Sequence, residues 1–135
     1  MASISLSSFA SKLDQELSFL WAVYLFGSHA SNQAMPDSDV DLAVLGKSPY
    51  TAADLFNVSS NLAIMLKRNV DLVDLRAVPT DLQAQIVTKG QRHVLTNFEQ
   101  IESFEDFVYS SYARLNEERK YILADIQQRG SVYGR

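Results

Sequence analysis

The fold of this chain can be predicted from one stretch, Tyr24-Leu-Phe-Gly-Ser-His-Ala-Ser-Asn-Gln-Ala-Met-Pro-Asp-Ser-Asp-Val-Asp-Leu-Ala-Val-Leu45. It begins inside an apolar run, from Trp21 to Phe26, that is rich in β-branched and aromatic residues and too short for a buried helix. Such a run predicts a buried strand. A second strand is expected from about Asp39 to Leu45. The stretch therefore predicts two strands joined by a loop, and polar residues gather where the strands meet that loop.

Two carboxylates lie close together at the start of the second strand. Asp39 and Asp41 are two residues apart, so both point to one face of the strand, while Val40 and Leu42 point to the other. Neighbouring like charges repel each other inside an apolar segment unless a cation compensates them. The available ligands are oxygen atoms, which suit magnesium or manganese better than zinc. The pair predicts a divalent metal site.

The first strand ends at Gly27 and Ser28, which predict a tight turn whose backbone can approach a phosphate. If a short helix begins at Ser28, its free N–H groups add an anion site. Ten residues separate Ser28 from Asp39. This pattern of Gly-Ser, ten residues and Asp-x-Asp resembles the signature of the nucleotidyltransferase superfamily that includes DNA polymerase β, kanamycin nucleotidyltransferase and the minimal nucleotidyltransferases. The resemblance implies metal-dependent transfer of a nucleoside monophosphate from a nucleoside triphosphate.

The superfamily also has a third carboxylate, on a neighbouring strand. The run from Asn69 to Leu75 predicts that strand and offers Asp71 and Asp74. These two differ by three positions and lie on opposite faces of a regular strand, so only one of them can join the metal site. Asp71 matches the Val-Asp-Leu-Val pattern of the family strand, and we assign it to the site. Asp74 is expected at the exit of the strand, as a solvated or capping carboxylate.

The rest of the chain predicts the elements that surround these strands. Apolar residues at three- and four-residue steps predict helices from Ser5 to Leu20 and from Thr51 to Leu66. A short helix is expected between Pro79 and Gly90, followed by a fourth short strand from about 92 to 95. This order predicts an α/β fold with a small mixed sheet packed with helices, and it resembles the minimal nucleotidyltransferase core. We expect residues 1–96 to form that domain.

Residues 97–135 are expected to form a C-terminal helical extension of the same compact unit. Its apolar seam runs from Phe98 to Ile126 at helical spacing. A continuous helix to Gln128 would be roughly 48 Å long at about 1.5 Å per residue, which is more than so small a core can cover. Part of its surface therefore needs cover from another chain, or the segment folds back at Ser103. A helix packed entirely on its own domain is the alternative.

Composition narrows the possible partners of this 135-residue chain, which is expected to form one domain. A net charge of −4 and a pI near 5.0 disfavour a domain that binds nucleic acid through its phosphates. No apolar run approaches the roughly 20 residues that a membrane span needs, so we expect no membrane contact. The first residues lack the basic region of a signal peptide, and there is no cysteine. A cytoplasmic location is therefore expected.

A catalytic core of this size, without a nucleic-acid or sugar-binding domain, resembles the minimal nucleotidyltransferase (MNT) antitoxins of bacterial HEPN/MNT (type VII) toxin–antitoxin systems. The resemblance implies a protein adenylyltransferase that moves AMP from ATP to a tyrosine hydroxyl of a cognate HEPN ribonuclease toxin. Asp39 and Asp41 would bridge two magnesium ions, or manganese, and Asp71 would complete the site. Gly27 and Ser28 would hold the phosphates.

Two other functions stay open. One is a small-molecule nucleotidyltransferase of the aminoglycoside-modifying kind, and the other is a non-catalytic antitoxin that acts by binding alone. The chain also departs from the family pattern, because family members often carry a basic residue shortly after Gly-Ser and here His29-Ala-Ser-Asn-Gln follows. Further phosphate or acceptor contacts are therefore expected from elsewhere. We expect His29 to face solvent and His93 to have no catalytic role.

Overall fold

The computed structural model describes residues 6–30 and 38–133, and the side chains of the last helix as far as residue 128. The elements in chain order are α1 (Leu6–Glu16), β1 (Leu20–Phe26), the short 3-10 helix η1 (Gly27–His29), β2 (Val40–Gly46), α2 (Ala52–Leu66), β3 (Val70–Asp74), α3 (Thr80–Lys89), β4 (Gln91–Val94) and α4 (Phe98–Tyr133). The predicted α/β fold with a small mixed sheet is confirmed. The first helix is shorter than predicted, because Phe19 takes a positive φ of 54° that a helix does not accommodate.

The four strands form one sheet in the order β3-β2-β1-β4. Strand β1 runs antiparallel to both β2 and β4, whereas β2 and β3 are parallel. The register places Asp41 opposite Phe26 on one side and opposite Asp71 on the other. The sheet therefore brings together residues from three separate parts of the chain around the start of β2.

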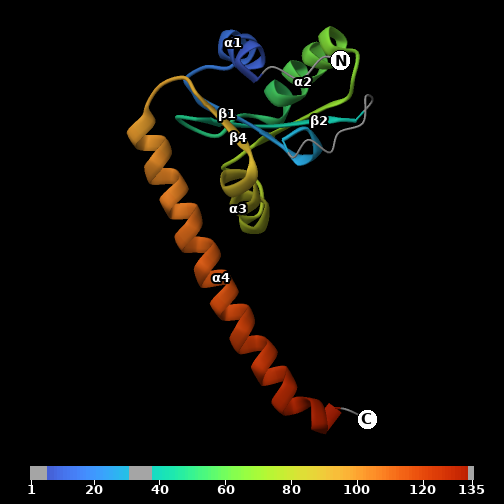
Figure 1. Ribbon diagram of the computed structural model, residues 1–135, viewed down its shortest axis with the longest axis vertical. Coiled ribbons are helices and arrows are strands. Elements are labelled where there is room, and N and C mark those ends of the chain that lie inside the picture. Colours follow the sequence, from blue (N-terminus) through green and yellow to red (C-terminus); the bar gives the residue numbers. More distant parts are fainter. Residues whose placement is uncertain (1–5, 31–37, 134–135) are drawn as a thin grey trace.

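Helices cover both faces of this sheet, with α1 and α2 on one face and α3 and the first part of α4 on the other (Figure 1). Alternate residues of β2 serve the two layers. Val40, Leu42 and Val44 are buried with α1 and α2, while Ala43 and Leu45 are buried with α3 and α4. Asp41 shares the second face with Ala43, two residues along the strand. The carboxylate of Asp41 therefore lies on the α3 and α4 side of the sheet.

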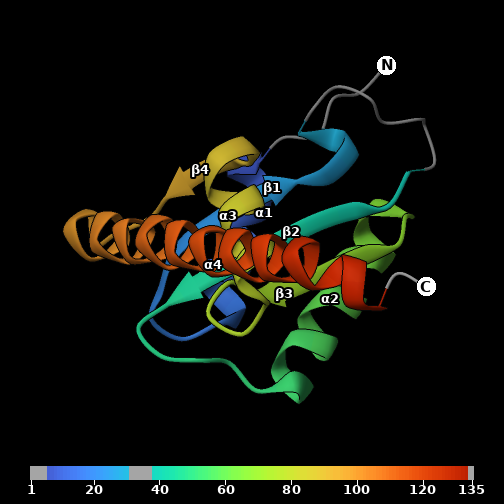
Figure 2. The ribbon, with the colours of Figure 1, turned by 90° about the horizontal axis from the view of Figure 1, so that it is seen from below.

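Helix α4 is a single helix of 36 residues, and the fold-back considered at Ser103 is wrong. Its first half packs on the core, where Ile101 and Val108 are fully buried. Beyond α3 the helix stands clear of the core and slants beneath the sheet, toward the end that carries η1 and the start of β2 (Figures 1 and 2). Within the described ranges, no helix is both long and apolar enough to cross a membrane.

A partly buried polar network attaches the first half of α4 to the sheet. The Tyr24 hydroxyl on β1 donates to Glu105 Oε2 at 2.6 Å, and Arg92 Nη1 on β4 donates to the same oxygen at 3.0 Å and to Glu102 at 2.6 Å. Burial, together with the hydrogen bond to the Glu105 carboxylate, raises the pKa of Tyr24 well above its ordinary value. The phenol therefore stays a donor, and α4 is held against the strand that leads into η1.

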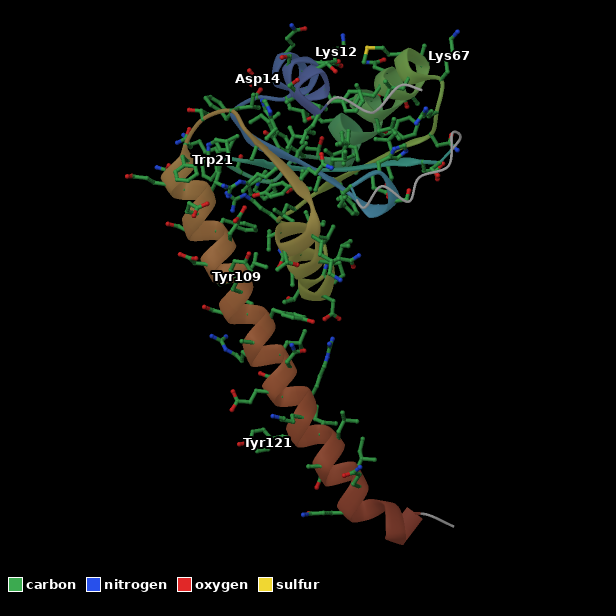
Figure 3. The ribbon with its side chains drawn as sticks, in the orientation of Figure 1. Lys12, Asp14, Trp21, Lys67, Tyr109 and Tyr121 are labelled. Carbon is green, nitrogen blue, oxygen red and sulfur yellow. The ribbon has the colours of Figure 1, made fainter. Side chains whose placement is uncertain are left out.

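A second attachment lies further along α4. Arg119 donates to both carboxylate oxygens of Asp81 in the first turn of α3, at 3.0 and 2.6 Å. After this pair the helix carries a run of exposed apolar side chains: Tyr121, Ile122, Leu123 and Ile126. Figure 3 shows Tyr121 far below the sheet, on the opposite side of the molecule from Asp14 in α1. The distal part of α4 therefore presents apolar surface that the core of this chain does not cover.

Candidate active site

The parallel pairing of β2 and β3 places two of the three predicted carboxylates side by side. Asp41 and Asp71 are direct register partners, so their side chains lie on the same face of the sheet. Asp41 is partly buried and Asp71 is exposed. Asp39 is exposed just before β2 begins, and its charge reaches Asp41. The structure thus gathers Asp39, Asp41 and Asp71 at one end of the sheet, and Asp41 and Asp71 lie on the face shared with α3 and α4.

The three carboxylates of this cluster lie near enough to one another to change the pKa of Asp41. Burial raises the pKa of Asp41 above its ordinary value, and the carboxylates of Asp71 and Asp39 raise it further, while His29 opposes the rise. A group of like charges with this effect on one another attracts a cation. It is the kind of charge distribution that a metal site or a positively charged ligand would balance.

The donor chemistry fits magnesium, because the three carboxylates supply oxygen ligands from one face of the sheet. Across the described parts of the chain, no three Asp, Glu or His side chains are gathered tightly enough to hold an ion as they stand. Like charges oppose a closer approach of the carboxylates when no counter-charge lies between them. The site fits magnesium in ligand type and in strand position, and holding an ion would require the side chains to come closer together.

Gly27 lies directly beside the cluster, and two features of the structure require glycine at this position. Its φ is +74°, in the left-handed region that residues with a Cβ rarely adopt. A Cβ built on Gly27 would also collide with Oδ2 of Asp41. The backbone of Gly27 and the carboxylate of Asp41 therefore lie so close together that no side chain fits between them. A phosphate bound at this turn would lie beside the carboxylate cluster.

The turn at Gly27 and Ser28 does not lead into the helix that was considered in the prediction. Ser28 does not begin a helix, because η1 spans only Gly27–His29 and closes with a bond from Ala30 N to Gly27 O at 3.2 Å. A single 3-10 turn has no appreciable helix dipole, so the anion site expected at a helix N-terminus is not formed. Any phosphate contact at Gly27 and Ser28 would come from the turn's own N–H groups and from the serine hydroxyl.

Asp74 lies at the exit of β3, as expected, but it is buried rather than solvated. Its Oδ2 accepts a hydrogen bond from Tyr50 N at 2.8 Å, and its Oδ1 accepts one from Arg76 N at 2.9 Å. It is only 3% exposed and lies on the same face as Leu72, away from Asp71. The carboxylate therefore joins the segment before α2 to the end of β3, and it does not belong to the cluster around Asp41.

The two histidines lie in different places. His93 on β4 is in register with Val23, whose side chain packs with α1 and α2, so His93 lies on the face away from the carboxylates. His29 does not simply face solvent as predicted: it is partly buried, and its Nε2–H donates to the carbonyl oxygen of Ser38 at 3.2 Å. No sequence pattern indicates this bond, because its two partners lie on either side of a loop. The bond between His29 and the segment before Asp39 is thus a feature that sequence reasoning missed.

Comparison with known proteins gives consistent results. A family model described as polymerase beta nucleotidyltransferase matches residues 11–99. The chain is 36% identical over 107 residues to the protein adenylyltransferase MntA of Shewanella oneidensis, and the match covers 79% of this chain and 76% of that protein.

Two solved structures extend the comparison. The chain is similar to a chain of a toxin–antitoxin complex with AMP-PNP, with a TM-score of 0.81 and 31% identity over 92% of this chain and 99% of that one. It is also similar to a chain of the complex between a tri-AMPylated Shewanella oneidensis HEPN toxin and its MNT antitoxin. That match has a TM-score of 0.73 and 30% identity over 90% of this chain and 94% of the other.

Proposed function

The chain belongs to the polymerase beta nucleotidyltransferase family, and from this premise we propose that it is an antitoxin adenylyltransferase. It transfers AMP from ATP to a tyrosine hydroxyl of a cognate HEPN ribonuclease toxin and thereby neutralises the toxin. The observation that carries this proposal is the pairing of Asp41 with Asp71 directly beside Gly27, within the part of the chain that the family model matches. Such an enzyme acts in the cytoplasm, where ATP and the RNA substrates of a ribonuclease are found.

The relatives support the donor and the acceptor of this reaction. MntA of Shewanella oneidensis is a protein adenylyltransferase, and one similar structure contains AMP-PNP, an analogue of ATP. Another contains an HEPN toxin that carries AMP groups together with an MNT antitoxin. The similarity to the matched chains of these two complexes extends over at least 90% of this chain, so it includes most of α4 as well as the sheet.

The proposed roles of the site residues follow from their positions in the structure. Asp39, Asp41 and Asp71 would hold magnesium, which supplies a counter-charge for the triphosphate and activates the attacking hydroxyl. Gly27 and Ser28 would hold the phosphates through the turn. Asp71 is the more exposed of the paired carboxylates, so an incoming tyrosine hydroxyl would reach it first. The phenol oxygen would bond to the α-phosphorus as the bond from that phosphorus to the β-phosphate oxygen breaks. Pyrophosphate would leave, and the phenol proton would pass to solvent.

The distal part of α4 is the surface that we assign to the toxin. Its exposed apolar residues follow the attachment at Arg119, and the helix slants toward the end of the sheet that carries the carboxylates (Figures 1 and 2). A partner bound there would lie below the active site, on the open side of Asp71. The acidic net charge of the chain also favours a protein acceptor over nucleic acid.

This assignment can be tested by replacing Ile122 and Ile126 with aspartate. Both side chains are more than half exposed, so the core should be unaffected, while association with the toxin should weaken by roughly 10-fold or more if either is an interface anchor. ATP binding should stay unchanged. Phe56→Asp on α2, also exposed but on the opposite face of the sheet, is the matched control. Truncation at Ser103 would be less informative, because it removes the buried Glu105 and Val108.

The reaction itself is read from the mass of the toxin after incubation with ATP. Transfer adds about 329 Da for each AMP, computed from the chemical formula, and tandem mass spectrometry should locate it on tyrosine. If the toxin's mass never changes while its ribonuclease activity is silenced, the chain is not a protein adenylyltransferase and acts as an antitoxin by binding alone. Adenylylation of aminoglycosides in place of the toxin would favour a small-molecule nucleotidyltransferase.

Gly27→Ala should impair transfer severely. The new Cβ meets Asp41 Oδ2 at a residue with positive φ, so the turn or the carboxylate has to move. A displacement of about 1 Å at a reacting centre can cost on the order of 100-fold in rate. Rates of transfer from labelled ATP, measured beside urea unfolding of the same protein, separate this effect from a loss of stability. Wild-type rates in Gly27→Ala would show that the turn does not contact the reacting groups.

A further inference from the structure

His29 joins the two chain segments that meet at the candidate active site. It is the last residue of η1, immediately after Ser28, and its Nε2–H donates to the carbonyl oxygen of Ser38 at 3.2 Å. A carbonyl oxygen can only accept, so the ring nitrogen carries the proton in this bond. Ser38 is the residue before Asp39. The imidazole therefore connects the Gly-Ser turn to the chain that enters β2 with the first carboxylate.

Each of these segments is also held on its own outer side. The turn is closed by Ala30 N to Gly27 O at 3.2 Å, and Gln91 of β4 donates to Ala30 O at 3.4 Å. On the other segment, Val40 N donates to Asn69 O at 3.0 Å, next to β3. These bonds fix the turn to one edge of the sheet and the start of β2 to the other. The bond from His29 to Ser38 links the two segments directly.

The spacing between the segments matters for the proposed chemistry. Gly27 and Ser28 would hold the phosphates, while Asp39 would hold a metal ion that must reach the same phosphates. The imidazole also counteracts the rise in the pKa of Asp41 that burial and the neighbouring carboxylates cause. A residue at this place can set the distance between the phosphate-binding turn and the first carboxylate.

We propose that His29 is a positioning residue of this enzyme: by donating to the Ser38 carbonyl, it holds Asp39 at the working distance from the Gly27 and Ser28 turn. The proposal rests on the proposed function for the meaning of that distance. His29 acts here as a hydrogen-bond donor and needs no contact with ATP.

The test compares two substitutions that differ in the donor. His29→Gln places an amide N–H near the position of Nε2, and His29→Leu keeps a similar volume without a donor. We expect His29→Leu to lower kcat for AMP transfer by about 10- to 100-fold and to weaken magnesium-dependent binding of AMP-PNP, as measured by calorimetry. His29→Gln should restore both values close to wild type. The same two substitutions at His93, on the other face of the sheet, should change neither.

The outcomes separate the possible roles. If His29→Gln is as defective as His29→Leu while both remain folded by circular dichroism and urea unfolding, the donor role is wrong and the ring acts by its charge or shape. If His29→Leu matches wild type, His29 has no positioning role. Calorimetry with AMP-PNP needs no toxin, so it still tests His29 if the toxin proves not to be the acceptor. A failure of the proposed function is thereby distinguishable from a failure of this inference.

Discussion

Asp41→Asn should abolish AMP transfer while leaving the protein folded, and Asp39→Asn should do the same. Each change removes the negative charge of a proposed magnesium ligand and keeps the size of the side chain. Metal ions contribute several kcal/mol of transition-state stabilisation, so the rate should fall by roughly 1,000-fold or more. Transfer from labelled ATP to purified toxin measures this loss. Asp14→Asn on α1, an exposed carboxylate on the other face of the sheet, should have no effect.

The same Asp41→Asn protein should be slightly more stable than wild type when no magnesium or ATP is present. In the folded state the pKa of Asp41 is raised above its ordinary value of 3.8, so the ionised carboxylate is disfavoured there relative to the unfolded chain. At neutral pH, asparagine removes that penalty. As the pH falls through the raised pKa, wild-type Asp41 becomes protonated and the advantage disappears. Urea unfolding of both proteins measures the stability difference at neutral pH and its loss at acidic pH. In the transfer assay, a near wild-type rate for Asp41→Asn would contradict the assignment of Asp41 to a metal site.

The two carboxylates of β3 should respond in opposite ways to the same substitution. Asp71→Asn should lower the transfer rate by orders of magnitude with little change in stability, because Asp71 is exposed and paired with Asp41. Asp74→Asn should instead lower the free energy of unfolding by about 1–3 kcal/mol, since one of two partly buried backbone N–H groups loses its carboxylate acceptor. Its transfer rate, measured below the unfolding transition, should stay near wild type.

This pair of variants tests the strand register directly. Parallel kinetic and urea-unfolding measurements on both proteins give four values, and the prediction is a crossed pattern in which each variant loses a different property. A catalytic defect in Asp74→Asn together with an active Asp71→Asn would show that the faces of β3 are reversed. Equal loss of both properties in both variants would show that the strand cannot be divided into a reacting face and a structural face.

Several of these expectations follow from the sequence because they depend on local geometry. The alternation of side chains along a strand places Asp41 on the face opposite to Val40 and Leu42 whatever the rest of the chain does. The same alternation separates Asp71 from Asp74. Apolar residues at three- and four-residue spacing identify the helices, including the long C-terminal one. These features concern neighbours in the chain, and a one-dimensional pattern contains all the information they need.

Other features of the site depend on which distant segments pair and pack. The register that sets Asp41 opposite Asp71 comes from the parallel pairing of β2 with β3, and no local pattern specifies it. The contact between Gly27 and Asp41 joins β1 to β2, and the bond from His29 to Ser38 spans a loop. Predicting the first from sequence required a family resemblance, and the other two could not be predicted at all.

In helix α4, one feature follows from the sequence alone and another depends on tertiary contacts. Its apolar seam was determined by the sequence alone, because helical spacing is a property of consecutive residues. Whether it folds back at Ser103 or runs on to Tyr133 was decided by the tertiary structure, in which Glu105 is held by Tyr24 and Arg92, and Arg119 is held by Asp81. Those partners are distant in sequence. Arg92 also holds Glu102, just before Ser103, so contacts secure the helix on both sides of the possible bend.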